Sequence, residues 1–325
     1  MSSSVTSSTS DSSDSAGRVV VTGGSGFVGR AVVRALLKRG TPVVVVGDRE
    51  PLPESVRDDR VTHVRGELAD PSIRDVALGE GAAGIIHLAA ITSVLKSAEQ
   101  PAETFETNVQ VTHELLELAR QRGIGQFVLA STNAVVGDIG TGTISEELPL
   151  QPLTPYGSTK AAGEMLLSGY AGSYGIAGSA LRFTNIYGPG MGHKDSFIPR
   201  LMRAALSGGG VQVYGDGSQS RDFVHLDDVV QGIMAAYDKQ YSGTAIIGSG
   251  ESISVLQLIE AVRAATGKPL PVEHVPAKQG EMPAVIVDVS KAKRELGYTP
   301  NVDLTEGLRT VWDDFRARAA ADGTP

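Results

Sequence analysis

Tyr156 and Lys160 are the two residues of this chain whose types and spacing most directly suggest chemistry. Four residues are about one helical turn, so both side chains would project from the same helix face. A free tyrosine, with a pKa of about 10, is a poor base at neutral pH. A neighbouring ammonium favours the phenolate and lowers that pKa, so the pair could take a proton from an alcohol. The same spacing is also common on solvated helix faces, so the pair needs support from the rest of the chain.

That support comes from three glycines near the N-terminus, placed where a strand pattern passes into a helical pattern. A β-branched run at 19–21 precedes Gly23, and an amphipathic segment from Phe27 and Val28 follows Gly26 and continues past Gly29. In a dinucleotide-binding turn the first glycine permits the sharp turn, and the second lets the backbone approach a phosphate. The third allows the helix to pack close to the strand. The order predicts a pyrophosphate site at the helix N-terminus.

A second apolar strand at 42–46 leads to Asp48. An acid at this strand tip accepts hydrogen bonds from the adenosine ribose hydroxyls and repels a 2′-phosphate, which favours NAD over NADP. The adjacent Arg49 weakens this preference. The alternative for Asp48 is an ordinary turn residue.

Composition excludes several classes of function. The net charge of −8 and isoelectric point near 5.3 argue against nucleic acid as a partner. The absence of cysteine excludes disulfides, thiolate metal sites and a cysteine nucleophile, and no metal is expected. No apolar stretch is long enough for a membrane span. Residues 1–16 are rich in serine, lack the regions of a signal peptide and predict a disordered tail, so we expect a cytoplasmic protein.

Short apolar strands alternate with amphipathic helices through the first half of the chain, which predicts an α/β fold with a doubly wound parallel sheet. The expected strands are 18–22, 42–46, 61–65, 84–88, 126–130 and 178–182, and the expected helices are 27–39, 72–78, 101–122 and 156–174. After about residue 183 glycine and proline become denser and the elements shorter. We therefore expect a Rossmann domain at 17–182, to which about 220–248 return, and a smaller mixed substrate lobe at 183–325.

Several motifs in order resemble extended short-chain dehydrogenases/reductases, in the nucleotide-sugar epimerase/dehydratase branch typified by UDP-glucose 4-epimerase. The resemblance runs from about residue 18 to about 315. The motifs are Thr22-Gly23-Gly24-Ser25-Gly26-Phe27-Val28-Gly29, His87-Leu88-Ala89-Ala90, Ser131-Thr132, Tyr156 with Lys160, Arg182-Phe183-Thr184-Asn185, Val213-Tyr214-Gly215-Asp216-Gly217-Ser218 and Arg221-Asp222-Phe223-Val224-His225.

The resemblance implies a bound NAD and a UDP-sugar oxidised at C4. Tyr156 would take the proton of the 4-hydroxyl, Thr132 would hydrogen-bond the same hydroxyl, and Lys160 would bind the nicotinamide ribose and keep Tyr156 ionised. Glu67 would lie near adenine. With the glycine turn, Asp48, Arg49, Tyr156 and Lys160, the implied cofactor-binding residues are Glu67, Leu68, Leu88, Ala89, Ala90 and Asn108.

The resemblance also implies a set of nucleotide-sugar contacts. Asn185 and Arg221 would grip the diphosphate, with Lys278 at a position that is often a second arginine. Phe197, Gln212 and Tyr214 would line the base pocket, although core packing is the alternative for the aromatic rings. The full set is Thr92, Thr132, Asn133, Tyr156, Asn185, Phe197, Gln212, Tyr214, Arg221, Lys278, Glu281 and Val285, with Glu281 at the nucleotide ribose and Val285 where a tyrosine narrows the sugar pocket of glucose-restricted relatives.

The residues after Thr132 bear on the fate of a 4-keto intermediate. In the pattern of relatives that eliminate water or carbon dioxide, an acid follows one or two positions after this threonine. In this chain those positions are Asn133 and Ala134, and neither can act as a carboxylate. This favours a 4-epimerase. The alternatives are a dehydratase or decarboxylase that takes its acid from Glu146 or Glu147, and a non-catalytic dinucleotide-binding regulator.

The resemblance further implies a homodimer built on the helices at 101–122 and 156–174. Their apolar residues exceed what one buried face needs; packing within one subunit is the alternative. The residues concerned are Leu115, Leu116, Leu118, Met165, Leu166 and Leu167.

Overall fold

The computed structural model describes residues 17–47, 52–277 and 282–321. The predicted tail at 1–16 therefore lies outside the described residues. A seven-stranded sheet forms the first lobe, with the strand order β3-β2-β1-β4-β5-β7-β11, and every pair in it is parallel. Its strands are β1 (Arg18–Thr22), β2 (Val43–Val46), β3 (Val61–Val64), β4 (Ala82–His87), β5 (Gln126–Thr132), β7 (Ala177–Phe183) and β11 (Gly243–Ile247).

The predicted doubly wound parallel sheet with a smaller C-terminal lobe is confirmed. The chain winds outward in one direction from β1 to β3 and in the other from β4 to β11. The direction of winding therefore changes between β1 and β4, where open α/β sheets bind ligands at the carboxyl ends of their strands. Each predicted strand is present, with ends shifted by no more than about two residues.

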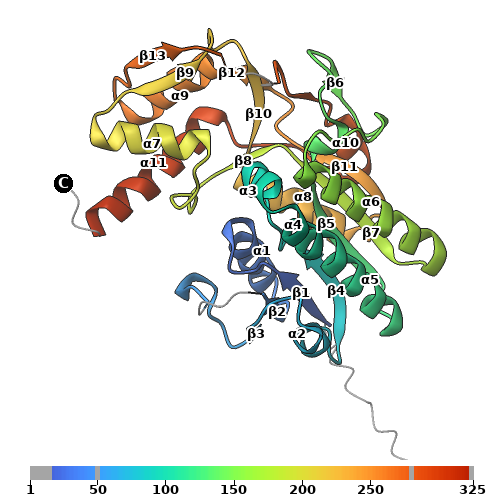
Figure 1. Cartoon of the computed structure of the whole chain (residues 1–325). Helices are drawn as coiled ribbons and strands as arrows, with labels where there is room; N and C mark the ends of the chain where they lie inside the picture. The colour runs from blue at the N-terminus through green and yellow to red at the C-terminus, as the bar shows by residue number, and fades with distance from the viewer. Residues whose placement is uncertain (1–16, 48–51, 278–281, 322–325) are drawn as a thin grey trace, which may run out of the picture.

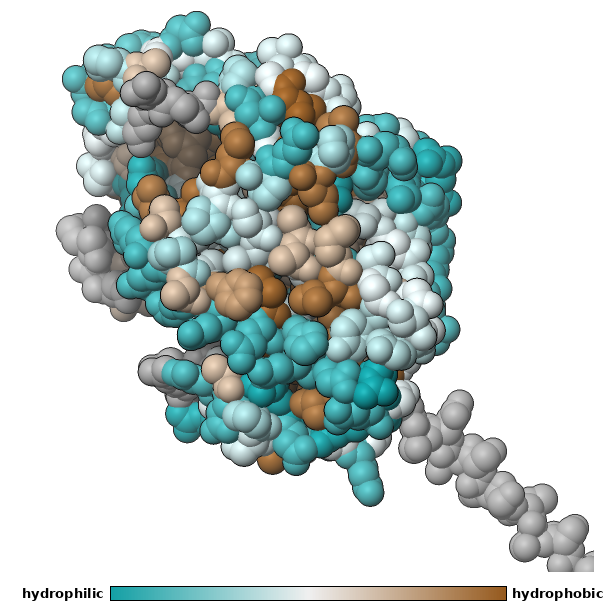
Figure 2. All heavy atoms as spheres, turned by 45° about the vertical axis from the view of Figure 1, so that its right-hand side comes forward, coloured by the Kyte–Doolittle hydropathy of each residue, from teal (hydrophilic) through white to brown (hydrophobic). Residues whose placement is uncertain are grey.

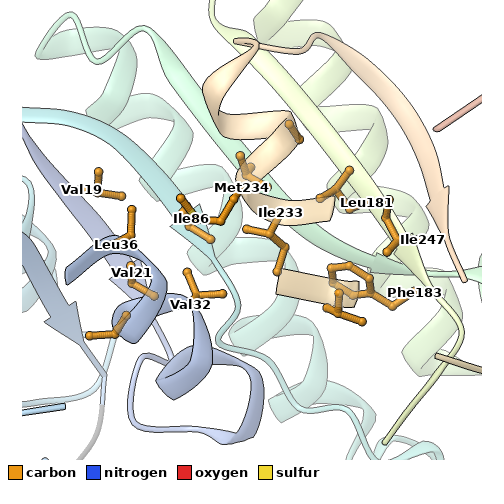
Figure 3. Close-up of a cluster of buried hydrophobic side chains, with 14 of the residues drawn as sticks. Val19, Val21, Val32, Leu36, Ile86, Leu181, Phe183, Ile233, Met234 and Ile247 are labelled. Atoms are coloured by element: carbon orange, nitrogen blue, oxygen red, sulfur yellow. The ribbon is translucent and has the colours of Figure 1, made fainter. Parts of the chain in front are cut away.

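Helices cover both faces of this sheet (Figure 1). One face carries α1 (Phe27–Lys38) and α8 (Leu226–Asp238), and the other carries α2 (Pro71–Ala77), α5 (Val111–Gln121) and α6 (Pro155–Tyr174). Figure 3 shows the first of these interfaces, where Val32 and Leu36 of α1 and Ile233 and Met234 of α8 lie against strand residues such as Ile86. Burial on both faces explains why the strands read as continuous apolar runs.

The predicted helix at 101–122 is present but not uniform. It consists of α4 (Pro101–Phe105), a π-helical turn at Glu106–Gln110 and α5. A short helix, α3 (Val94–Glu99), precedes it and was not predicted. Single π-helical turns are often found at functional sites, and this one contains Asn108.

The second lobe has its own apolar core and small sheets. Residues such as Leu201, Leu258, Leu308 and Trp312 pack together in it. Its sheets are β12-β10-β8, β13-β9 and β14-β6, the last shared with the first half of the chain. The elements are β6 (Thr143–Ile144), β8 (Asn185–Tyr187), α7 (Phe197–Ser207), β9 (Val211–Tyr214), β10 (Ser220–His225), β12 (Ser252–Ser254), α9 (Val255–Thr266), β13 (Val272–Val275), β14 (Ile286–Val287) and α11 (Leu304–Ala321). The helix α10 (Ser290–Leu296) lies between them in sequence but packs into the core of the first lobe.

Two short 3₁₀ turns complete the described elements, at Glu54–Val56 and Asn133–Val136. Within the described ranges, no helix is both long and apolar enough to cross a membrane.

The outer side of α3, α4 and α6 is unusually apolar. Leu95, Phe105 and Met165 are 76%, 54% and 58% exposed, and Leu153, just before α6, is 70% exposed. Figure 2 turns this side of the molecule forward and shows apolar residues gathered across its middle. The sequence-based choice of residues was wrong in most positions: Leu115, Leu116 and Leu167 are buried within the subunit, and Leu118 and Leu166 pack against the same core. Of that set, Met165 alone is among the strongly exposed apolar residues.

Candidate active site

The glycine turn has the shape that its sequence predicts. Gly23 has a φ of +66°, a region that favours glycine. A Cβ atom on Gly29 would lie 2.0 Å from the carbonyl oxygen of Gly23, so only glycine lets α1 pack this close to the turn. A Cβ atom on Gly26 would lie 3.0 Å from the same oxygen. No side chain caps the first amides of α1, which suits a pyrophosphate at the helix N-terminus.

The turn lies directly against the segment that follows β4. A Cβ atom on Gly23 would lie 3.0 Å from the amide nitrogen of Ala89. The hydroxyl of Thr22 accepts hydrogen bonds from the amides of Leu88 and Ala89, both at 3.1 Å. Leu88, Ala89 and Ala90 are partly buried at this edge. The turn after β1 and the segment after β4 therefore form one continuous edge at the change in winding direction.

Asn108 ties this edge to α6. Its Oδ1 accepts from the amide of Ile91 at 2.8 Å, and its Nδ2 donates to the carbonyl of Ile91 at 3.0 Å and to Thr159 Oγ1 at 3.1 Å. The Thr159 hydroxyl in turn donates to the carbonyl oxygen of Tyr156. The side chain of Asn108 is therefore engaged by protein groups, and it fixes the backbone at Ile91. Thr92, just beyond Ile91, is exposed.

The start of α6 lies close to the end of β5. Thr154 caps the helix by accepting from the amide of Gly157, and a Cβ atom on Gly157 would lie 2.9 Å from the carbonyl oxygen of Ala134. This approach brings the side chain of Tyr156 near Thr132, which influences the pKa of the phenol. Thr132 Oγ1 also accepts from the amide of Ala134 at 3.2 Å. Asn133, partly buried, begins the 3₁₀ turn beside them.

The pKa of Tyr156 differs from the sequence-based expectation. Burial raises it above its ordinary value, and the hydrogen bond from Thr132 offsets part of that rise. The expected lowering by Lys160 is not found, because the Lys160 ammonium donates to the carbonyl oxygen of Ala130 at 2.9 Å. A buried phenolate needs a positive charge nearby, so the chain alone holds Tyr156 as a neutral phenol.

Lys160 is buried near the ion pair of Glu164 and Arg182. Burial lowers its pKa to about 8, and the charge of Glu164 opposes that shift. Glu164 is itself buried, accepts from Ser131 Oγ, and pairs with Arg182 Nη2 at 2.7 Å and Arg182 Nε at 3.0 Å. Burial and the Lys160 charge together lower the pKa of the neighbouring His87 to about 3. The buried Lys160 charge therefore disfavours a second positive charge on the His87 ring.

Five of the predicted substrate residues lie on β8, β9 and β10 and at the start of α7 in the second lobe. Asn185 begins β8 and donates its Nδ2 to the carbonyl of Asp222 at 2.8 Å, and Arg221 Nη1 donates to the carbonyl of Ser220. The exposed Gln212 on β9 donates to Glu273 at 3.3 Å, and Tyr214 ends the same strand partly buried. Phe197, the first residue of α7, packs against the lobe core.

Val285 is 3% exposed in an apolar cluster that includes Val136 and Ala161. Its side chain therefore packs against other apolar side chains. At the other end of the site, Leu68 is buried beside Gly47, and Glu67 is exposed in the same loop. The predictions for Asp48, Arg49, Lys278 and Glu281 fall outside the described residues.

Sequence reasoning missed Asp222, which has no exposed surface. Its carboxylate accepts from Thr184 Oγ1 at 2.6 Å, from the amide and hydroxyl of Ser249, and from the amide of Gly250. It thus fixes β10, and with it the adjacent Arg221, against the loop after β11. The signal for it was the Arg-Asp pair at the start of the 221–225 motif, of which we assigned a role only to the arginine.

A sequence profile of the NAD dependent epimerase/dehydratase family matches residues 19–248. The chain belongs to this family. NAD is its cofactor, and it is an enzyme of the extended short-chain dehydrogenase/reductase type. The chain is 31% identical to a UDP-glucose 4-epimerase of Corynebacterium glutamicum, over 94% of this chain and 97% of that one. It is 34% identical to a dTDP-glucose 4,6-dehydratase of Streptomyces griseus, over 89% and 91% of the two chains.

A solved structure supports the same family. The protein MoeE5 in complex with UDP-glucuronic acid and NAD superposes with a TM-score of 0.84 at 36% identity, covering 93% of this chain and 100% of that one. The residues of this epimerase/dehydratase that would hold NAD fit the cofactor, because the glycine cradle leaves no room for side chains and presents uncapped amides. Epimerases and dehydratases match this chain at similar identity, so sequence identity alone does not distinguish the two reactions.

Proposed function

We propose that this chain is an NAD-dependent 4-epimerase of a UDP-sugar that acts through a transient 4-keto intermediate. The observation that carries the proposal is the composition of the site around Thr132 and Tyr156. A proton acceptor and a hydroxyl partner lie together there, while the two positions after Thr132 hold Asn133 and Ala134. A dehydratase or decarboxylase needs a further acid or base to remove its leaving group.

The acids that could serve a dehydratase are engaged or distant in this structure. Glu146 Oε1 accepts from the amide of Ile246 on β11 at 2.7 Å, so its carboxylate serves the edge of the sheet. Glu147 is exposed. Glu164 is bound by Arg182 and Ser131. These placements favour return of the hydride over elimination.

The chain contributes proton transfer and positioning to this reaction. NAD, when bound, supplies the acceptor for hydride from C4 and the source for its return. Tyr156 Oη takes the 4-hydroxyl proton and gives it back after the ketosugar has turned over. Thr132 holds the hydroxyl for that transfer, and the buried Lys160 charge, together with a positively charged cofactor ring, would stabilise the phenolate. The glycine turn and the edge at 88–90 would hold the cofactor.

We assign the nucleotide to the second lobe, 183–325, with the Rossmann domain formed by 17–182 and the returning segment at about 220–248. Arg221 and Asn185 would bind the diphosphate, since a guanidinium forms directional hydrogen bonds with phosphate oxygens. Phe197, Gln212 and Tyr214 would complete the nucleotide pocket, together with Lys278 and Glu281, which lie outside the described residues. Val285 is buried among other apolar residues, so its packing does not select among glucose, N-acetylglucosamine and glucuronate. The sugar is identified by analysis of the reaction products.

Product analysis tests this proposal. Incubation with UDP-glucose, UDP-N-acetylglucosamine and UDP-glucuronate should convert at least one of them to its C4 epimer, as followed by proton NMR. A 4-keto-6-deoxy sugar or released carbon dioxide would establish the dehydratase or decarboxylase alternative. Bound NAD without any conversion would favour the non-catalytic regulator.

We further propose that two copies associate through the apolar side of α3, α4 and α6. Phe105→Glu should place a charge in that interface and convert a dimer to a monomer in light scattering at about micromolar concentration. Val76→Glu on α2 is a matched control, because Val76 is 65% exposed outside this surface, and it should leave the dimer intact. A monomer mass for the parent protein would overturn the assembly.

A further inference from the structure

A chain of buried hydrogen bonds runs beneath the cofactor edge, with His87 at its centre. His87 Nδ1 lies 2.6 Å from Thr22 Oγ1, and His87 Nε2 lies 3.0 Å from Thr112 Oγ1. All three side chains are at most 2% exposed, and the ring packs edge-on against Phe127. Buried polar atoms depend on such partners because water does not reach them.

The neighbouring groups determine which atom donates in each hydrogen bond of this network. The Thr112 hydroxyl donates to the carbonyl oxygen of Asn108 at 2.7 Å. Its oxygen can therefore only accept from the ring, which places the proton on His87 Nε2. Nδ1 is then a bare acceptor, and the Thr22 hydroxyl must donate to it. The Thr22 oxygen accepts in turn from the amides of Leu88 and Ala89.

A charged imidazole does not fit this arrangement. With protons on both ring nitrogens, Nδ1 would present a third donor to Thr22 Oγ1, which already accepts two amides. Burial and the charge of Lys160 oppose protonation as well, and they lower the pKa of His87 to about 3. The neutral ring is thus the one form that satisfies both of its neighbours.

The two ends of this hydrogen-bond network lie at the glycine turn and beside the start of α6. At one end, Thr22 holds the amides that follow β4, where the glycine turn packs on Ala89. At the other end, Asn108 holds Ile91 and reaches Thr159, whose hydroxyl binds the carbonyl of Tyr156. His87 is therefore the link between β1, which carries the glycine turn, and the π-helical turn beside α6.

We propose that His87 is a positioning residue, held as the neutral Nε2–H tautomer, that aligns the cofactor-binding backbone at 88–90 with the helix carrying Tyr156 and Lys160. It touches neither cofactor nor substrate in this proposal and acts through Thr22 and Thr112. Its kinetic consequence rests on the epimerase function proposed above, whereas its tautomer does not.

Nitrogen-15 NMR of the histidine rings tests the tautomer. The His87 ring, assigned by its loss in His87→Gln, should show a protonated Nε2 and a bare Nδ1, unchanged between about pH 5 and pH 8. A proton on Nδ1, or titration within that range, would overturn the proposal whatever the enzyme's substrate is.

Matched variants of Thr112 test the positioning. Thr112→Val keeps the shape but removes the acceptor of Nε2–H, whereas Thr112→Ser keeps the hydroxyl. We expect kcat per bound NAD to fall about tenfold in Thr112→Val, with KM for the UDP-sugar within about twofold, and to recover to within about threefold in Thr112→Ser. Ser179→Ala removes a buried β7 hydroxyl for which the described part of the chain offers no hydrogen-bond partner, and it should leave kcat unchanged.

Dividing kcat by the amount of bound NAD separates an effect on the alignment of the active site from an effect on folding. A purely structural role would lower the thermal midpoint and the amount of holoenzyme but leave kcat per bound NAD at the parent value in Thr112→Val, and this result would refute the proposal. If the parent enzyme converts none of the UDP-sugars, the proposed function fails. The NMR measurement of the His87 tautomer would then still decide whether the ring is held in the Nε2–H form, because it does not depend on turnover.

Discussion

Tyr156→Phe should lower turnover at least about 100-fold while the protein stays folded and keeps its NAD. The substitution retains the ring and its packing on α6 but removes the oxygen that accepts the proton of the sugar hydroxyl. Thr132 Oγ1 still accepts from the amide of Ala134, so its position at the end of β5 is kept. The loss should therefore appear in kcat rather than in stability, and steady-state kinetics with a thermal melt measure the two separately.

Tyr174→Phe provides the matched control on the same helix. Tyr174 is 56% exposed, and its ring, which phenylalanine keeps, contacts the ring of Tyr170 and the guanidinium of Arg120. It should turn over at the parent rate. If Tyr156→Phe also retains near-parent turnover, Tyr156 is not the base and the site around Thr132 must be reinterpreted.

The fold of the first lobe could be predicted because its signals are local. The valines of β2 and the glycines at 23, 26 and 29 specify a buried strand and a tight turn by residue type alone. The π-helical turn at Glu106–Gln110 could not be predicted this way, since its cause is the set of contacts that Asn108 makes with Ile91 and Thr159. Those partners lie 17 and 51 residues away along the chain.

The site was predicted unevenly for the same reason. Motif positions named the groups that touch ligands, and Thr132 and Tyr156 do lie together. The sequence said nothing of the second layer, in which Asp222, Glu164 and His87 hold those groups through buried hydrogen bonds. It also misjudged the electrostatics of Tyr156, because the balance between burial and a neighbouring charge depends on where the Lys160 ammonium points.

Lys160→Met should reduce turnover at least about 100-fold and yet make the nucleotide-free protein more stable at pH 7. Lys160 is 5% exposed, and burial lowers its pKa from 10.5 to about 8. Below about pH 8 the folded protein bears the whole penalty of a buried ammonium. Between about pH 8 and pH 10.5 the unfolded chain binds more protons than the folded one, so stability rises with pH across that window.

Methionine has a similar length and no charge, so it removes that penalty. The shift corresponds to at most about 3 kcal/mol, and losing the hydrogen bond to Ala130 offsets about 1 kcal/mol of it. Glu164 stays paired with Arg182 and Ser131. We expect a gain of about 1–2 kcal/mol and a thermal midpoint higher by about 2–5 °C at pH 7, shrinking as the pH approaches 10. Thermal melts of both proteins, freed of nucleotide, at these two pH values provide the measurement. A lower midpoint for Lys160→Met at pH 7 would show that the buried ammonium stabilises the fold, and would contradict the view that this charge is retained for catalysis.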